Sequence, residues 1–128
     1  FLEYCSRHSI RKNGFFMMGF PRETEEDVMK TIEYISSRPF DDVAISIVVA
    51  YPGTKLYRNV YGKEKLVIPG FGNMDLSKVT SEEMRNRLRK YSSTPRVSLS
   101  EHIGIERLLE LRNLAYEIFY ESKRGILE

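Results

Sequence analysis

Cysteine, net charge and long hydrophobic stretches are all scarce in this sequence of 128 residues. The single cysteine, Cys5, excludes an internal disulfide framework and predicts a reducing, cytoplasmic location. The longest apolar run, residues 43–50, is interrupted by Ser46 and is far too short to cross a membrane. The net charge of +2 gives no support for a nucleic-acid-binding protein, which usually carries a larger basic surplus. We therefore expect neither a membrane nor a nucleic acid among the partners.

The chain does not begin with methionine, and its first residues have the pattern of a helix that is already under way. Residues 1–12 carry apolar positions at Leu2 and Cys5 and cations toward the end, and the pair Asn13-Gly14 is a stop signal. We therefore expect a piece cut from a longer protein. Its length is enough for one domain with a modest core.

Two apolar runs separated by an amphipathic helix predict a βαβ unit. Residues 15–20 and residues 43–50 are continuous enough to be strands covered on both faces, as in parallel sheets. Between them Thr24 can cap a helix that has three acids in its first turn and an apolar stripe that includes Val28 and Ile32. Such a unit is right-handed almost without exception, and both strands end at the same edge. The predicted fold class is therefore α/β.

Beyond the second strand, the sequence predicts turns followed by helices. Residues 51–72 are rich in glycine and proline, with one helical turn expected at residues 55–59. Thr80-Ser81-Glu82-Glu83 has the pattern of a capping box that opens a helix through about residue 91. Residues 92–100 are expected to be a linker, and residues 101–123 are expected to form a long amphipathic helix.

A loop follows each of the two predicted strands, and both loops contain glycine. Residues 19–24 (Gly-Phe-Pro-Arg-Glu-Thr) follow the first strand, and residues 51–54 (Tyr-Pro-Gly-Thr) follow the second. Parallel α/β sheets bind ligands at the carboxyl ends of their strands, and glycine allows a close backbone approach. In the alternative interpretation Pro21 only stops the strand, Thr24 only caps the helix, and nothing binds. The coincidence of two such loops at one edge favours a binding site.

These motifs resemble the later part of a radical S-adenosylmethionine (SAM) enzyme. The similarity is strongest over residues 14–58 and is closest to the cobalamin-binding-domain-associated subgroup, which includes the anaerobic magnesium-protoporphyrin IX monomethyl ester oxidative cyclases. The resemblance implies a partial (β/α)6 TIM-like barrel. Residues 1–62 would hold its last two strands, and residues 63–128 would form a helical C-terminal extension in the same compact unit.

The resemblance also implies a set of residues at the SAM site. In this family SAM lies across the carboxyl ends of the last strands, so Met17 is the expected adenine contact and Ala50 the backbone position that meets the adenine edge. Arg22 departs from the common glycine, so either the local turn differs from that of the family or Arg22 points toward an anionic group. The implied cofactor-binding residues are Met17, Met18, Gly19, Pro21, Glu23, Thr24, Ala50 and Tyr51.

The iron–sulfur chemistry of that family needs three cysteines, and this chain has only Cys5. The resemblance therefore implies a parent oxidoreductase or transferase that uses SAM, a 4Fe-4S cluster and, in this subgroup, cobalamin. The cluster ligands would lie outside this chain, which would be inactive alone. The implied partner is the rest of the parent barrel. Two strands cut from a longer sheet leave unpaired edges, so we expect these strands to pair with a second copy of the chain or to be covered by the terminal helices. No metal ligand is expected here, because His8 and His102 lack the spacing of a metal pair.

Two other interpretations stay open at this point. One is a stand-alone, non-catalytic α/β module for binding or interaction. The other is an unrelated α/β domain that binds a phosphate where the helix begins near Thr24. The basic segment at residues 85–90 is interpreted as a solvated helix face or a docking surface, because no aromatic residues are interleaved with its cations. Cys5 is interpreted as a small core residue.

Overall fold

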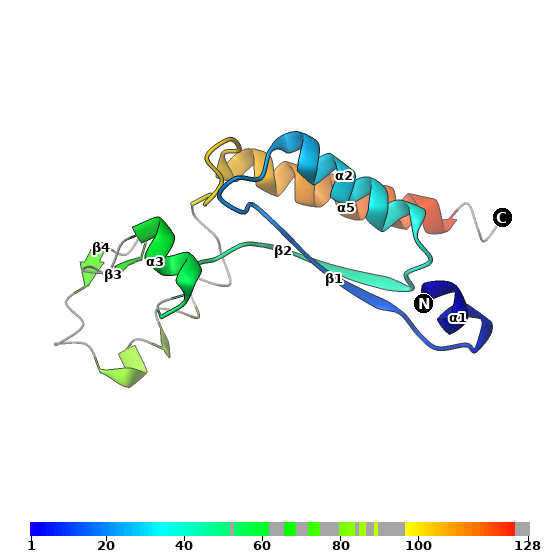
Figure 1. Cartoon of the computed structure of the whole chain (residues 1–128), viewed down its shortest axis with the longest axis horizontal. Coiled ribbons are helices and arrows are strands. Elements are labelled where there is room, and N and C mark those ends of the chain that lie inside the picture. The colour runs from blue at the N-terminus through cyan, green and yellow to red at the C-terminus, as the bar shows by residue number, and fades with distance from the viewer. Residues whose placement is uncertain are drawn as a thin grey trace.

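The computed structural model describes residues 1–51, 53–61, 66–68, 72–74, 80–83, 85–86, 89 and 97–124. The elements in chain order are α1 (Leu2–Arg7), β1 (Asn13–Met18), α2 (Glu25–Ser37), β2 (Asp42–Ile47), α3 (Lys55–Tyr61), β3 (Leu66–Ile68), β4 (Gly72–Met74) and α5 (Ile105–Arg124). Strands β1 and β2 pair in parallel, and β3 and β4 form a short antiparallel pair. Figure 1 shows α2 and α5 side by side over one face of the β1–β2 sheet. The predicted α/β class is confirmed.

The β1–α2–β2 segment forms the expected βαβ unit. The strands pair in register from Asn13 opposite Asp42 to Met18 opposite Ile47. One further hydrogen bond, from the Val48 amide to the Met18 carbonyl at 2.8 Å, continues the pairing beyond the assigned strands. Both strands end before the predicted boundaries. Two strands cannot close a barrel, so the described residues establish an α/β fold and not the expected partial barrel.

Among the residues that the structure describes, helices cover only one face of this sheet, which corrects the expectation that both strands are buried on both faces. Burial alternates along the strands, so that Met18, Val43 and Ile45 face the helices and are nearly inaccessible. On the opposite face, Phe15 is 82% exposed and Met17 is 51% exposed. The reason is that both packing helices, α2 and α5, lie on the same side of the sheet.

Helix α5 completes the core although it lies far from the βαβ unit in sequence. Its apolar face packs on α2 and on β2, and its largest buried side chain is Phe119, which is fully inaccessible. Each large side chain buried in this way contributes about 1.5–3 kcal/mol of hydrophobic stabilisation. The buried core residues are Met18, Val28, Ile32, Ile35, Phe40, Val43, Ile45, Ile47, Ile103, Leu108, Leu111, Ala115 and Phe119.

The outer edge of β2 is closed by side chains. The Ile45 amide points away from β1 and donates a hydrogen bond of 2.8 Å to the Tyr116 hydroxyl of α5. The Val43 amide donates to the Asp42 carboxylate at 2.9 Å, and that carboxylate also accepts from the Tyr120 hydroxyl at 3.4 Å. Strand β1 has no such cover, because β2 is its one neighbouring strand in the part of the chain that the structure describes.

Several boundaries outside the βαβ unit differ from the predicted ones. Helix α1 ends at Arg7, and Ser9 then adopts a φ of 55°, so this helix is shorter than expected. Helix α3 has seven residues instead of one turn, while α5 begins at Ile105 rather than at residue 101. The β3–β4 pair was not predicted.

Part of the predicted helix after Thr80 can be checked. Residues 81–83 are helical, and the Glu83 amide donates to the Thr80 hydroxyl at 3.2 Å, as expected of a helix start. The predicted helix end near residue 91, most of the predicted linker, and Pro52 lie outside the described residues. Among the helices that are described, none is long and apolar enough to span a membrane.

Candidate functional site

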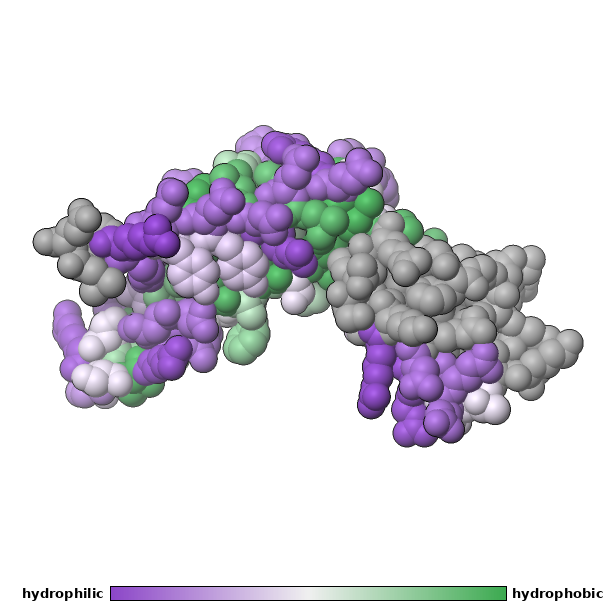
Figure 2. Space-filling model, turned by 180° about the vertical axis from the view of Figure 1, so that it is seen from behind, coloured by the Kyte–Doolittle hydropathy of each residue, from purple (hydrophilic) through white to green (hydrophobic). Residues whose placement is uncertain are grey.

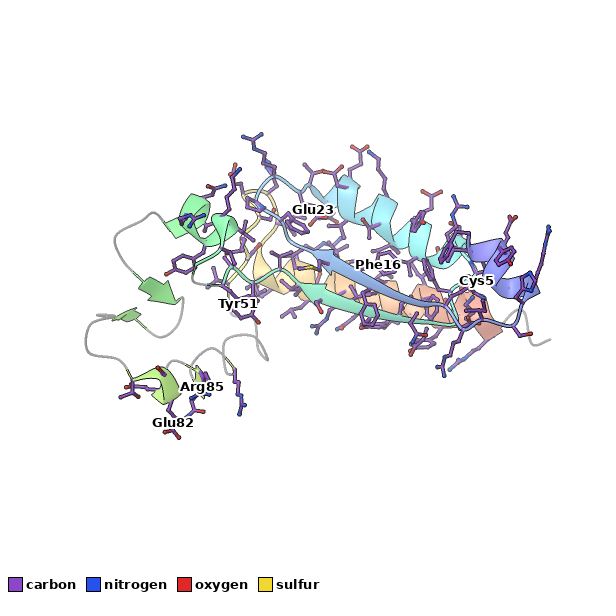
Figure 3. All side chains as sticks on the ribbon, turned by 60° about the horizontal axis from the view of Figure 1, so that its bottom comes forward. Cys5, Phe16, Glu23, Tyr51, Glu82 and Arg85 are labelled. Carbon is purple, nitrogen blue, oxygen red and sulfur yellow. The ribbon has the colours of Figure 1, made fainter. Side chains whose placement is uncertain are left out.

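The two loops singled out in the sequence lie at the same edge of the sheet. Because β1 and β2 run in parallel, the loop that begins at Gly19 and the segment that begins at Val48 both start at the carboxyl edge. Figure 3 shows Glu23 and Tyr51 toward this end of the β1–β2 sheet and Cys5 toward its opposite end. This is the edge at which open α/β sheets bind their ligands.

Glu23 closes the loop after β1. Its carboxylate oxygen Oε2 accepts hydrogen bonds from the backbone amides of Gly19 and Phe20, the latter at 3.1 Å. The Glu23 amide donates back to the Phe20 carbonyl at 3.0 Å. Two backbone amides that converge on one oxygen form a small anion-binding nest, which here is filled by the side chain of the loop itself. Glu23 therefore shapes the rim of the site.

Gly19 is required by the conformation and the surroundings of the chain. Its φ is +95°, a region that residues with a side chain rarely adopt. A Cβ atom at this position would lie 2.8 Å from the Cδ1 atom of Leu108. The first turn of α5 thus presses directly against the end of β1 and fixes the course of the loop.

A segment that was predicted to be linker holds this loop in place. The Ser100 hydroxyl donates a hydrogen bond to the Glu23 carbonyl at 2.8 Å. It also accepts hydrogen bonds from the backbone amides of His102 and Ile103, at 3.1 Å each. The Glu101 amide donates to the Pro21 carbonyl at 2.9 Å. Sequence reasoning missed Ser100. The sequence signal that could have identified it is a serine just before a helix, because a serine hydroxyl there can accept hydrogen bonds from the backbone amides two and three residues later.

Thr24 caps α2, as predicted, and a complete capping box is present. The Asp27 amide donates to the Thr24 hydroxyl at 3.3 Å, and the Thr24 amide donates to the Asp27 carboxylate at 3.1 Å. The hydrogen bonds from Thr24 lower the pKa of the Asp27 carboxyl. Three acids, Glu25, Glu26 and Asp27, crowd this first turn. The capping box and this negative charge weigh against the phosphate site that was one of the alternatives.

The remaining expected site residues are divided between two faces. Met18 is fully buried against the helices, so only its backbone lies near the edge, whereas Met17 lies on the uncovered face of the sheet. Ala50 is 1% exposed and Tyr51 is 41% exposed. The Thr54 hydroxyl donates a hydrogen bond of 2.7 Å to the Tyr51 carbonyl, and this bond shapes the turn before α3. The edge thus combines Met17, the backbone near Ala50 and the Tyr51 ring.

An open depression of about 770 Å³ lies beside the loop after β1. Its walls come from this loop, from α3 and from the segment before α5. Apolar side chains form most of it, and three polar side chains complete it. The lining residues are Phe20, Pro21, Arg22, Leu56, Asn59, Val60, Leu99 and Glu101. Of these, Phe20, Pro21 and Arg22 belong to the loop at residues 19–24 that the sequence singled out.

The other candidates from the sequence do not gather at this edge. Cys5 is buried in the first helix, and the His8 ring packs on Tyr4 with the ring centres 4.2 Å apart. Within the described ranges, no group of three His, Cys, Asp or Glu side chains is arranged to hold a metal ion. Arg85 donates a hydrogen bond to the Ser81 carbonyl of its own helical segment at 3.3 Å.

Comparisons with known proteins give one informative relative. No protein-family model matches the chain, and no solved structure matches it. An uncharacterized methyltransferase of Pyrococcus horikoshii is 28% identical over 124 residues, which is 97% of this chain. The match covers 23% of that relative, so the chain spans about a quarter of the relative's length. The similarity is therefore to one segment of a protein that is named as a methyltransferase.

The assignment to radical SAM enzymes, and with it the oxidative-cyclase function, is corrected by these findings. The relative is named as a methyltransferase and not as a radical SAM oxidoreductase or a cyclase, and no family model supports the motif resemblance. The 4Fe-4S cluster and the cobalamin expected of the parent are withdrawn with it.

The structure explains why the motifs misled. Gly19 and Gly53 both have positive φ, Pro21 follows the strand, and Thr24 caps a helix. Glycine and proline are common in turns, and threonine is common at helix starts, whatever the family. The motifs therefore predicted the local turn and the helix start, and they did not identify a family.

Proposed function

We propose that this chain is part of a SAM-dependent methyltransferase and that the carboxyl edge of the β1–β2 sheet contributes to the binding of the methyl donor. The reaction class is suggested by the methyltransferase of Pyrococcus horikoshii, which aligns with nearly the whole chain. The observation that carries the binding site is structural. Two glycine-containing loops, one after each parallel strand, open at one edge.

The residues at this edge fit the chemical groups of SAM. Met17 offers a half-exposed apolar side chain, and Tyr51 offers an exposed ring on which an adenine base can stack. The backbone near Ala50 can provide hydrogen bonds to the edge of the base. Glu23 and Thr24 already hold their own loop and helix, so their role is to shape the rim. Bound SAM would supply the methyl group.

A titration of the uniformly 15N-labelled chain with SAM, followed by two-dimensional NMR, tests this proposal. Saturable shifts are expected for the amides of Gly19, Ala50 and Tyr51. Met17→Ala should weaken SAM binding about fivefold, because about 1 kcal/mol of apolar contact is lost. Met29→Ala is the matched control, since Met29 is also a half-exposed methionine but lies on the outer surface of α2.

Two results would overturn the proposal. One is the absence of any saturable shift at millimolar SAM. The other is equal weakening by Met17→Ala and Met29→Ala, which would show that the uncovered face of the sheet is not involved.

A further inference from the structure

The depression beside the loop after β1 combines an apolar wall with separated charges. Leu99 is buried at 7% exposure, and Leu56 and Val60 of α3 are half-buried beside it. Phe20 adds an aromatic ring that is 43% exposed. Figure 2 shows hydrophobic surface, in green, at several places between hydrophilic side chains, so apolar surface alone does not distinguish this depression. The polar groups around it do.

Arg22 is the residue that the loop geometry does not explain. Glu23 and Thr24 are both engaged in hydrogen bonds that hold the local structure, whereas the Arg22 guanidinium makes no hydrogen bond or ion pair with any residue that the structure describes. A guanidinium that is not used by the fold and that borders an apolar wall is suited to a carboxylate, sulfonate or phosphate group on a ligand with an apolar body.

Glu101 and Asn59 set the polarity of the rest of the depression. The Glu101 amide is bound to the Pro21 carbonyl, so the position of this residue is fixed relative to Arg22 by the backbone. Its carboxylate accepts hydrogen bonds and repels a second anionic group. The Asn59 amide from α3 can both donate and accept. The depression therefore suits one anionic group together with a hydrogen-bond donor.

We infer that this depression binds the methyl acceptor, and that the acceptor is an organic molecule with an apolar, ring-sized body and one anionic group that pairs with Arg22. The naming of this ligand as the acceptor rests on the proposed function; its chemical class rests on the lining residues alone. The depression adjoins the proposed donor site through the continuous segment from Gly19 to Arg22. Donor and acceptor would thus meet at one rim.

The test uses the 15N-labelled chain and two small probes of the same shape, 1-naphthoate and the uncharged 1-naphthamide. Naphthoate is expected to shift the amides of Leu56, Val60 and Leu99 in a saturable way. Arg22→Gln should weaken naphthoate binding about fivefold and leave naphthamide binding unchanged, as the loss of one partly exposed ion pair predicts. Arg58→Gln is the matched control, because Arg58 is an exposed arginine of α3 that does not line the depression.

Either of two outcomes overturns the inference. If naphthoate shifts only the amides of Phe15 and Met17, it binds the uncovered face of the sheet instead. If Arg22→Gln and Arg58→Gln weaken naphthoate binding equally, only the overall charge of the chain matters. Failure of the proposed function is seen separately, in the SAM titration. A chain that binds naphthoate through Arg22 but does not bind SAM would keep this site and lose its assignment to methyl transfer.

Discussion

Removal of the Glu23 side chain should release the loop after β1, and the cost can be worked out from its contacts. In Glu23→Ala the amides of Gly19 and Phe20 both lose their acceptor. Gly19 is buried, so its amide cannot be rehydrated, whereas Phe20 is 43% exposed and its amide regains water. One buried unpaired amide costs about 1–3 kcal/mol, and the exposed one adds little, which gives about 2 kcal/mol in total.

Urea unfolding followed by circular dichroism measures this loss. With a slope of about 2 kcal/mol per molar, a loss of about 2 kcal/mol lowers the midpoint by about 1 M. Glu23→Gln keeps a carbonyl oxygen in the same place and should lose about half as much, because only the charge assistance is removed. Glu33→Ala, on the exposed surface of α2, controls for the loss of a carboxylate.

Hydrogen exchange identifies the source of the effect. The Gly19 amide should exchange much faster in Glu23→Ala than in Glu23→Gln. The order of exchange rates among the amides in the middle of α5 should be the same in both variants. A Glu23→Ala chain that unfolds at the same urea concentration as the Glu33→Ala chain would refute the reasoning, since it would show that the two amides do not depend on this carboxylate.

Three further predictions follow from other contacts. Gly19→Ala should destabilise the chain by about 2–4 kcal/mol in urea unfolding, because a positive φ is combined with a clash against α5. Tyr116→Phe removes the acceptor of the Ile45 amide, so that amide should exchange faster in hydrogen exchange and stability should fall by about 1 kcal/mol. The hydrogen bond from Arg107 lowers the pKa of Glu25 below its usual value of 4.5, so its stabilisation is present above about pH 4.5 and is lost as the pH falls through the lowered pKa. Unfolding curves at decreasing pH should show this loss in the natural chain and a smaller one in Glu25→Gln.

Matched variants separate these causes from general damage. Gly53 also has a positive φ of 88°, but no atom of the described residues lies within 4 Å of the position that a Cβ would take, so Gly53→Ala should cost less than Gly19→Ala. Equal losses would mean that the clash with α5 is unimportant. Tyr34→Phe is the control for Tyr116→Phe. If both leave the exchange of the Ile45 amide unchanged, the Tyr116 hydroxyl does not cap the strand.

The parts of the fold that local sequence determines could be predicted. Thr24 and Asp27 form a capping box over four residues, and Val28, Ile32 and Ile35 form a stripe that any helix of this sequence must bury. These interactions depend on neighbours in sequence, so the residues themselves are sufficient evidence.

The parts that depend on distant residues could not be predicted. The hydrogen bond from Ser100 to Glu23 joins residues 77 apart, and that from Ile45 to Tyr116 joins residues 71 apart. No local pattern encodes either pairing. The depression is also a product of three separate segments, so Leu56 and Leu99 could not be connected before the chain was folded. The prediction that both sheet faces are covered was wrong for a similar reason, since an apolar run shows that a strand can be buried and not which elements cover it.

The Tyr116 hydroxyl on the Ile45 amide has a consequence for how this sheet can grow. A strand that joins the sheet would find the Val43 and Ile45 amides of β2 already occupied, whereas β1 has no second neighbouring strand among the residues that the structure describes, so addition would be directed to the β1 side. Two copies joined at their β1 strands would present two capped outer edges, and assembly would stop at the pair instead of continuing into a fibre.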